Sequence, residues 1–234
     1  MEPKRGLRCD LHIHSCLSPC AHILMTPGNI IKQALKIGLD CIAITDHNSA
    51  GNIRVALELA AKSGLKLIPG MEVETREEVH LLCYFSELDA LFEWESIIKP
   101  RLPHLPNTEE LFGYQLLTDL NDQYTAKEEQ LLAAAADISL TEAVKTITEL
   151  GGLAVPAHVD RPVNSILTQL GFIPPGAGIK VIEISQNSEP EVFMNARPEL
   201  RQYQWMQGSD SHYLDSIRGF AVDEAILKML SATL

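Results

Sequence analysis

The sequence lacks the long apolar segment that a membrane-spanning helix requires. No apolar run approaches the roughly 18 residues needed to cross a bilayer, although 46% of the 234 residues are hydrophobic. Residues 1–8 carry charges without a hydrophobic stretch, so no secretory signal is expected. These features predict a cytoplasmic protein without a membrane partner, and the length predicts a single domain over residues 1–234.

The chain also has few cysteines and an excess of acidic over basic residues. Five cysteines, an odd number without a repeating framework, favour reduced thiols over a disulfide scaffold. Lys and Arg total 19 against 31 Asp and Glu, which gives a net charge of −12. Because capture of duplex DNA needs a basic face, we expect no duplex DNA partner. A small phosphorylated substrate, or a short single-stranded nucleic acid, remains compatible with this charge if metal ions hold it, and the oligomeric state stays open.

Short apolar strand candidates alternate with amphipathic helix candidates along the chain. Helices are predicted at residues 26–38, 52–64 and 139–152, the first with Thr26 as its N-cap and Gly38 at its end. Strands are predicted at residues 7–14, 39–47, 65–74, 79–85, 153–159 and 179–185. Alternation of this kind predicts an α/β sheet or barrel.

Residues 88–140 interrupt this alternation. The segment shows no clear strand pattern and has two proline-bearing turns, and helical stretches are predicted at residues 89–100 and 126–138. We therefore expect residues 88–140 to be a small helical insertion within the single domain.

Potential metal ligands gather in the segment DLHIHSCLSPC, residues 10–20. Asp10, His12 and His14 alternate along a predicted strand, so their side chains are expected to share one face. Two imidazoles on one face can chelate an ion, but an isolated His-x-His motif is equally compatible with two solvent-facing histidines. The ionisable residues at the ends of the other predicted strands favour chelation of an ion.

Ionisable residues recur at the ends of other predicted strands and in the motif GSDSH. They are Asp46, His47, Glu72, Glu74, His158, Asp210 and His212. In an α/β barrel the C-terminal ends of the strands meet at one mouth, where these side chains would cluster. Clustered ionisable groups are costly unless they are paired or bound to metal, so the set indicates a metal or catalytic centre.

The ordered motifs DLHIHS, TDH, GMEVE, HLLCYF, PAH and GSDSH resemble those of the polymerase and histidinol phosphatase (PHP) superfamily. The resemblance extends from residue 7 to about residue 222 and favours its stand-alone phosphoesterases, which act on nucleoside phosphates and short nucleic-acid ends. It implies a distorted (β/α)7 TIM-like barrel with up to three divalent metal ions at the strand ends. It also implies an insertion that helps to form the substrate pocket, where residues 88–140 lie.

The resemblance further implies a set of ligands for these ions. They are His12, His14, Glu72 and Asp210 for the first ion, Glu72, His80 and His158 for the second, and Cys20, His47 and His212 for the third. Strand periodicity alone leaves Glu72 and Glu74 equivalent, and the family pattern selects Glu72. Cys20 departs from the family, which usually has a His or an acid there.

Such a centre suits the hydrolysis of a phosphate ester. Two or three divalent ions about 3.5–4 Å apart lower the pKa of a bridging water and polarise a phosphoryl group. Mixed His and carboxylate ligands favour Zn²⁺, Mn²⁺ or Fe²⁺ over Mg²⁺ or Ca²⁺. A Cys20 thiolate would bias the third site toward softer metals, although Cys20 could instead be an ordinary buried or loop thiol, as is expected for Cys16.

Three further residues are candidates for catalytic or phosphate-binding roles. Asp46 could orient a ligand or the attacking water, or could cap the helix predicted from residue 52. Arg161 and Arg218 are the arginines nearest in sequence to predicted ligands, which makes both candidates for phosphate recognition, although surface arginines are common.

Three alternatives to this function remain open. A histidinol-phosphate phosphatase would use the same ligands, and a non-catalytic metal-binding module could keep them without turnover. A hydrolase of C–N bonds would also use a barrel with His and Asp ligands, but no lysine stands where a bridging carbamate would be needed.

Overall fold

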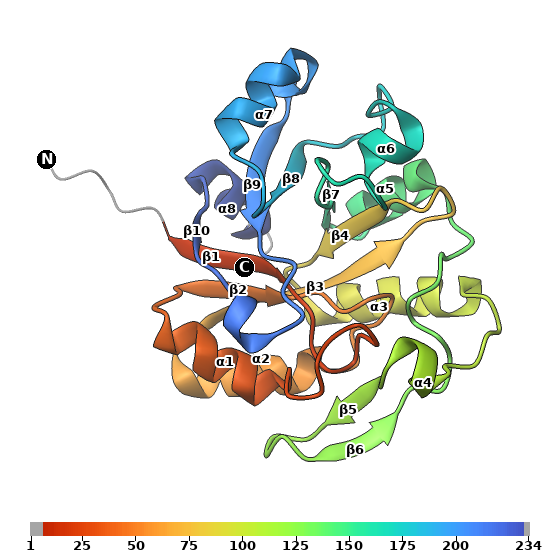
Figure 1. The fold of residues 1–234 in the computed structure, drawn as a ribbon, viewed down its shortest axis with the longest axis vertical. Helices are drawn as coiled ribbons and strands as arrows, with labels where there is room; N and C mark the ends of the chain where they lie inside the picture. The colour runs from red at the N-terminus through yellow and green to blue at the C-terminus, as the bar shows by residue number, and fades with distance from the viewer. Residues whose placement is uncertain (1–6, 232–234) are drawn as a thin grey trace, which may run out of the picture.

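The computed structural model describes residues 7–231 (Figure 1). Strands β1 to β10 are Arg8–Ile13, Cys41–Ile44, Lys66–Glu74, His80–Tyr84, Leu116–Thr118, Tyr124–Lys127, Leu153–Pro156, Val181–Ser185, Gln204–Gly208 and Phe220–Ala221. Helices α1 to α8 are Pro27–Lys36, Ile53–Ser63, Leu88–Ile98, Glu109–Phe112, Leu140–Glu149, Ile166–Leu170, Pro190–Ala196 and Glu224–Ser231. The expectation about a secretory signal at residues 1–8 falls mostly on residues 1–6, which lie outside the described residues.

The strands curl into an incomplete ring. The main sheet has six strands in the order β10-β1-β2-β3-β4-β7. Strands β1, β2 and β3 are parallel, whereas β4 is antiparallel to both β3 and β7. Strands β8 and β9 form a separate parallel pair, in which β8 contacts β7 and β9 contacts β1. This pair therefore lies against both β7 and β1 without joining their hydrogen-bonded sheet (Figure 1).

Both faces of the ring bury apolar side chains, which explains the continuous apolar strand patterns. On β2, Ile42 and Ile44 belong to the larger buried cluster, which includes the inner faces of α1 and α2. Cys41 and Ala43 belong to a second cluster with Ile226 of α8. The strands are thus held between two apolar layers, and their ends are left to carry polar groups.

The structure confirms most of the predicted elements. An observed strand lies within each of the six predicted strand ranges, and an observed helix lies within each of the three predicted helix ranges. Thr26 caps α1 by accepting a hydrogen bond from the Asn29 N–H, and Gly38 follows the helix with φ of +72°. The α/β class is confirmed and is compatible with a distorted TIM-like barrel. The count of seven strand–helix units stays a prediction, because the strands divide between two hydrogen-bonded sheets.

The prediction of a purely helical insertion at residues 88–140 is wrong. Helix α3 occupies the first predicted helical stretch, but β5 and β6 pair as an antiparallel hairpin and no helix forms over residues 126–138. Tertiary contacts override the helical propensity of this alanine-rich run. The Leu132 N–H donates to Gln115 Oε1, and the Ala136 N–H donates to the Glu74 carbonyl of β3.

A buried asparagine attaches the hairpin to the ring. Asn52, which precedes α2, is fully buried and donates to the Ser15 hydroxyl at 2.9 Å and to the Leu116 carbonyl at 3.1 Å. Its amide oxygen accepts from the Thr118 N–H at 3.1 Å. Since Ser15 lies in the loop that follows β1, Asn52 ties the hairpin to the end of that strand.

None of the helices within residues 7–231 combines the length and the apolar character that a membrane span needs.

Replacing Asn52 with Ala is expected to loosen the hairpin. The change leaves the Thr118 N–H without its partner and removes one donor to the Leu116 carbonyl, so the free energy of unfolding should fall by about 1–3 kcal/mol. Hydrogen exchange should accelerate at β5 before other strands. Asn187→Ala, at an exposed loop position, is the control. Unchanged exchange at residues 116–118 in Asn52→Ala would contradict this role.

Candidate metal centre

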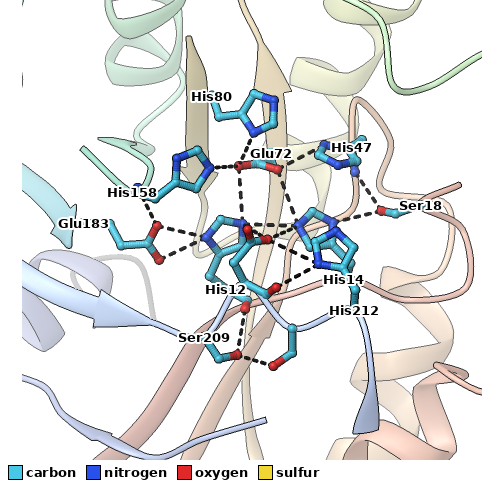
Figure 2. A network of polar contacts seen from close by, with 12 residues as sticks. His12, His14, Ser18, His47, Glu72, His80, His158, Glu183, Ser209 and His212 are labelled. Atoms are coloured by element: carbon cyan, nitrogen blue, oxygen red, sulfur yellow. Dashed lines mark hydrogen bonds and ion pairs between the residues drawn. The ribbon is translucent and has the colours of Figure 1, made fainter. Parts of the chain in front are cut away.

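Side chains from six strands converge at one mouth of the ring (Figure 2). The residues are His12 on β1 and His14 just after it, His47 after β2, Glu72 on β3, His80 at the start of β4, His158 after β7, and Asp210 and His212 after β9. The structure therefore brings together the predicted ligands from distant parts of the chain.

The reversal of β4 explains how a residue at the start of a strand reaches this mouth. His80 is the first residue of β4 and pairs with Glu74 at the end of β3. Because β4 runs antiparallel to β3 and β7, its start lies beside their ends. The backbone after two other strands is also unusual, since His158 and Asp210 have φ of +31° and +50°. Such conformations are uncommon for residues other than glycine and often occur at functional sites.

The Glu72 carboxylate is the centre of the cluster. It is fully buried, and neither of its oxygens has a hydrogen-bond partner among the described residues. Five imidazoles surround it, with Nδ1 of His47 and His80 at 3.0 Å and Nε2 of His12, His14 and His158 at 3.3, 3.5 and 3.6 Å. Glu74, two residues on, is partly exposed. The structure thus distinguishes two residues that strand periodicity leaves equivalent.

Glu183 determines which nitrogen of His12 faces Glu72. Nδ1 of His12 lies 3.0 Å from both carboxylate oxygens of Glu183, so Nδ1 is the nitrogen that carries hydrogen. In the neutral ring, Nε2 then presents a lone pair toward Glu72 and toward Asp210 Oδ1 at 3.2 Å. Three acceptors therefore point at one another.

A serine and an aspartate fix His14 in the same way. The Ser18 hydroxyl donates to Asp46 Oδ1 at 2.7 Å, so its oxygen accepts from Nδ1 of His14 at 3.0 Å. Nε2 of His14 then carries a lone pair, and it lies 3.2 Å from Nε2 of His12. Two imidazole lone pairs at this distance repel each other unless a proton or a metal ion lies between them.

The spacing of these donors fits bound metal ions. Two ligand atoms bound about 2.1 Å from one tetrahedral ion lie about 3.4 Å apart, close to the separations around Glu72. In three sets of residues, the ligand atoms within each set lie within 4.8 Å of one another. The sets are His12, His14 and Asp210; His47, Glu72 and His80; and His14, His47 and His212. The first set contains three of the four ligands predicted for the first ion. The second set has His47 where His158 was predicted, and the third has His14 where Cys20 was predicted.

Cys20 lies at the outer side of this cluster. Its Sγ is 3.1 Å from Nε2 of His212, and it also contacts His47. Crowding by neighbouring atoms disfavours the thiolate, but His47 and His212 outweigh this effect and lower the pKa of Cys20 to about 6. Cys16 is buried instead, with its Sγ donating to the Leu116 carbonyl. The structure therefore separates the two thiols of the DLHIHSCLSPC segment.

The charges of the centre depend on one another. Burial alone would raise the pKa of Glu72, but His80 and His12 lower it well below its usual value. Burial, reinforced by His212 and His47, lowers the pKa of His14 well below its usual value. Burial also disfavours protonation of His12, yet Glu183, Asp210 and Glu72 raise its pKa well above its usual value. The carboxylates thus create a negative field that attracts a cation.

Of the three predicted catalytic candidates, Asp46 and Arg161 adjoin the centre. Asp46 is buried and bonds Ser15 and Ser18, so it supports His14 through Ser18. It is not the helix cap, because Asn52 holds the N-cap position of α2. Nη1 of Arg161 pairs with Asp210 Oδ2, and the Arg161 side chain is 29% exposed at the mouth.

Arg218 does not reach the centre. Its Nη1 donates to the backbone carbonyls of Asp215 and Ile217 in its own turn, and only its backbone N–H approaches the site, by donating to Asp10 Oδ2. The described contacts of the Arg218 side chain thus give no support to a phosphate-binding role, which stays a prediction. Proximity in sequence to GSDSH did not indicate the direction of this side chain.

Two residues of the site were missed by the sequence reasoning. Glu183 also accepts from the backbone N–H of His158, and a Cβ at Gly208 would lie 1.9 Å from Glu183 Oε1, so Gly208 leaves room for the carboxylate. The amide of Asn164 lies 2.8 Å from Nε2 of His80. A lone acid inside the apolar strand VIEIS was a usable signal, since a buried charge needs a partner. No comparable signal marked Asn164.

The fold and the donor set define an α/β ring with clusters of potential metal ligands at its mouth. The sequence profile of the PHP domain matches residues 10–164, and the chain belongs to the PHP domain family.

Two curated relatives match a shorter stretch. A 5′-3′ exoribonuclease of Salmonella typhimurium is 36% identical over 78 residues, which cover 31% of this chain and 26% of the relative. A 3′,5′-nucleoside bisphosphate phosphatase of Chromobacterium violaceum is 34% identical over 76 residues, again 31% of this chain and 26% of the relative. The matched stretch thus spans about a quarter of these curated relatives.

A solved structure extends the likeness in fold to most of the chain. The lesion-specific endonuclease of Pyrococcus furiosus superposes with a TM-score of 0.68 and 21% identity, covering 91% of this chain and 50% of the endonuclease. Endonuclease Q has also been solved with a 27-mer duplex substrate. The expectation that duplex DNA is excluded is therefore unsupported, because this fold serves an enzyme that binds a duplex.

Replacing Glu183 with Gln is expected to weaken metal binding by roughly 10–100-fold, the usual effect of removing a partner that orients a ligand. The amide can offer an NH₂ group to Nδ1 of His12 and no longer fixes the orientation of that ring. Metal titration by calorimetry measures the change. Glu189→Gln, an exposed acid that makes no capping hydrogen bond to α7, is the control. Equal affinity in the Glu183 and Glu189 variants would show that Glu183 does not position His12.

Proposed function

We propose that this chain is a metal-dependent phosphoesterase that hydrolyses a small nucleotide-like phosphate ester. The observation that carries the proposal is the convergence of Glu72 and Asp210 with Nε2 of His12 and of His14, whose separations are 2.9–3.5 Å. Such a set binds divalent cations, and its imidazole-rich composition favours Zn²⁺, Mn²⁺ or Fe²⁺.

The proposed ligands follow the three clusters. His12, His14, Glu72 and Asp210 would hold one ion, Glu72 with His80 and His158 a second, and His47, His212 and Cys20 a third. His47 also lies 3.0 Å from Glu72, so it is placed to serve either of the last two. Bound ions of this kind activate water and neutralise charge on a phosphoryl group.

The protein itself would supply orientation and phosphate recognition. Arg161 pairs with Asp210 through one guanidinium nitrogen and is partly exposed, so its other N–H groups are free to meet a phosphate oxygen at the mouth. In the overall reaction a water oxygen bonds to phosphorus, the ester bond breaks, and the leaving oxygen departs with a proton as an alcohol. Asp46 would act only through Ser18, by holding His14.

A small substrate fits the charge of the chain. With a net charge of −12, a long polyanion gains little from the surface as a whole, whereas a single phosphate meets the cations of the centre. The nucleoside bisphosphate phosphatase and the exoribonuclease among the relatives support a nucleotide-like ester.

A phosphate-release screen tests this proposal. The panel contains nucleoside mono- and bisphosphates, 5′-phosphorylated oligonucleotides, histidinol phosphate and sugar phosphates, each with added Mn²⁺ or Zn²⁺. Release from nucleotides that stops on chelation is the expected result. A metal-loaded protein inert toward the entire panel would contradict the proposal, and preference for histidinol phosphate would replace the substrate class.

Replacing Glu72 with Gln is expected to lower turnover by more than about 100-fold and to reduce the metal content at two sites, because one carboxylate serves both. Glu74→Gln, on the partly exposed neighbour, should retain both properties. Elemental analysis and phosphate release measure the pair. Identical metal content in the two variants would show that Glu72 is not the bridging ligand.

Replacing Cys20 with Ser is expected to remove about one metal ion per chain and to weaken activity, since a hydroxyl is a far poorer ligand than a thiolate for soft metals. Cys16→Ser is the matched control, because Cys16 lies beneath the hairpin and is expected to keep the full complement. The assignment fails if the stoichiometry of Cys20→Ser equals that of the unmodified protein.

A further inference from the structure

His80 lies between the Glu72 carboxylate and the side-chain amide of Asn164. Figure 2 shows the ring beside Glu72, with Nδ1 at 3.0 Å from Glu72 Oε1. On the other side of the ring, Nε2 is 2.8 Å from Nδ2 of Asn164. Because an amide nitrogen donates hydrogen bonds and accepts none, this pairing requires a lone pair on Nε2 and places the hydrogen of the neutral ring on Nδ1. In this tautomer Nδ1 has no lone pair to offer to a cation.

The backbone holds Asn164 beside the ring. The Asn164 carbonyl accepts from the His80 N–H at 3.0 Å, so one residue contacts both the backbone and the ring of His80. The next residue, Ser165, is fully buried, donates to the Arg161 carbonyl and accepts from the Thr168 N–H. Asn164 has φ of +54°, a conformation that asparagine tolerates better than most residues. The amide therefore stays next to Nε2 whichever way it is turned.

An asparagine amide offers a donor and an acceptor from nearly the same place. Rotation of the side chain by about 180° around χ2 exchanges Nδ2 and Oδ1, so Asn164 can either donate to a lone pair on Nε2 or accept from a hydrogen there. A cation at Nδ1 needs the lone pair of that nitrogen, and the neutral ring then carries its hydrogen on Nε2. With the amide in its present orientation, Nδ2 would meet that hydrogen donor to donor, whereas Oδ1 would accept it.

We propose that Asn164 is a positioning residue that lets His80 change tautomer when a divalent cation binds. Without the cation, Nδ2 donates to Nε2. With a cation at Nδ1, the amide turns over and Oδ1 accepts from the Nε2 hydrogen. One proton leaves Nδ1 and one joins Nε2, so the ring stays neutral. The inference rests on the proposed function and adds the residue that makes His80 available to the ion assigned to Glu72, His80 and His158.

Nitrogen-15 spectra of labelled histidine rings test the change of tautomer. In the unmodified protein, His80 should carry its hydrogen on Nδ1 without metal and on Nε2 after zinc is added. In Asn164→Asp the carboxylate can only accept, so Nε2 should carry hydrogen both with and without zinc. The signals of His80 are assigned by their loss from the spectrum of His80→Gln.

Zinc titration by calorimetry gives the second readout. Asn164→Gly removes the amide without straining the positive φ and should weaken the binding of one zinc ion by roughly 10–100-fold. Asn164→Asp should bind that ion at least as tightly as the unmodified protein, whereas a merely structural role for Asn164 would weaken both variants alike. Asn187→Gly and Asn187→Asp make the same changes at an exposed loop position. These controls should leave zinc affinity and the His80 signals unchanged.

The inference is overturned if His80 carries its hydrogen on Nε2 in the metal-free unmodified protein. Zinc affinity that is equal in Asn164→Gly and the unmodified protein, or lowered equally in Asn164→Gly and Asn164→Asp, would also overturn it. Both readouts are taken without substrate, so they do not depend on turnover. Absence of phosphate release with the expected tautomers and affinities would contradict the proposed function alone, and normal release with zinc affinity indifferent to Asn164 would contradict this inference alone.

Discussion

The structure depends on one electrostatic constraint, which is that acceptors converge around a buried carboxylate. Glu72 is fully buried, five imidazoles surround it, and Nε2 of His12 and of His14 lie 3.2 Å apart beside it. Burying a charge without a partner is among the costliest events in folding. Protonated imidazoles or bound metal ions offset this cost. The centre therefore links the stability of the fold to the chemistry that we propose.

The rest of the fold holds this centre in place. Parallel strands bring their C-terminal ends to one mouth, and the reversed β4 adds His80 from its start. Glu183 orients His12, and Gly208 leaves the space that Glu183 needs. On the outer side, Asn52 fixes the hairpin to the loop after β1. The loop after β1 thus contacts the ligand cluster through Cys20 and the hairpin through Ile23.

Much of the fold was predictable because strand and helix patterns are local. The apolar strands and the Thr26 cap could be read directly. The hairpin could not, since residues 126–138 have helical propensity and adopt another structure only through bonds to Gln115 and Glu74.

The site was predictable to a similar extent. The motifs gave the residues that meet at the mouth, while spacing alone left Glu72 and Glu74 equivalent. The contacts of Arg218 could not be predicted, because they depend on the turn at residues 215–217. Glu183 and Asn164 were missed because each acts through a contact that forms only in the folded chain, with His12 and His80.

The most direct test of this account is anomalous X-ray diffraction from crystals of the protein grown with Mn²⁺ or Zn²⁺. The account predicts an anomalous peak within about 2.0–2.3 Å of a Glu72 oxygen and of Nε2 of His12 or His14. A well-ordered Glu72 surrounded only by water or by protonated imidazoles, with no anomalous peak among these residues, would contradict it.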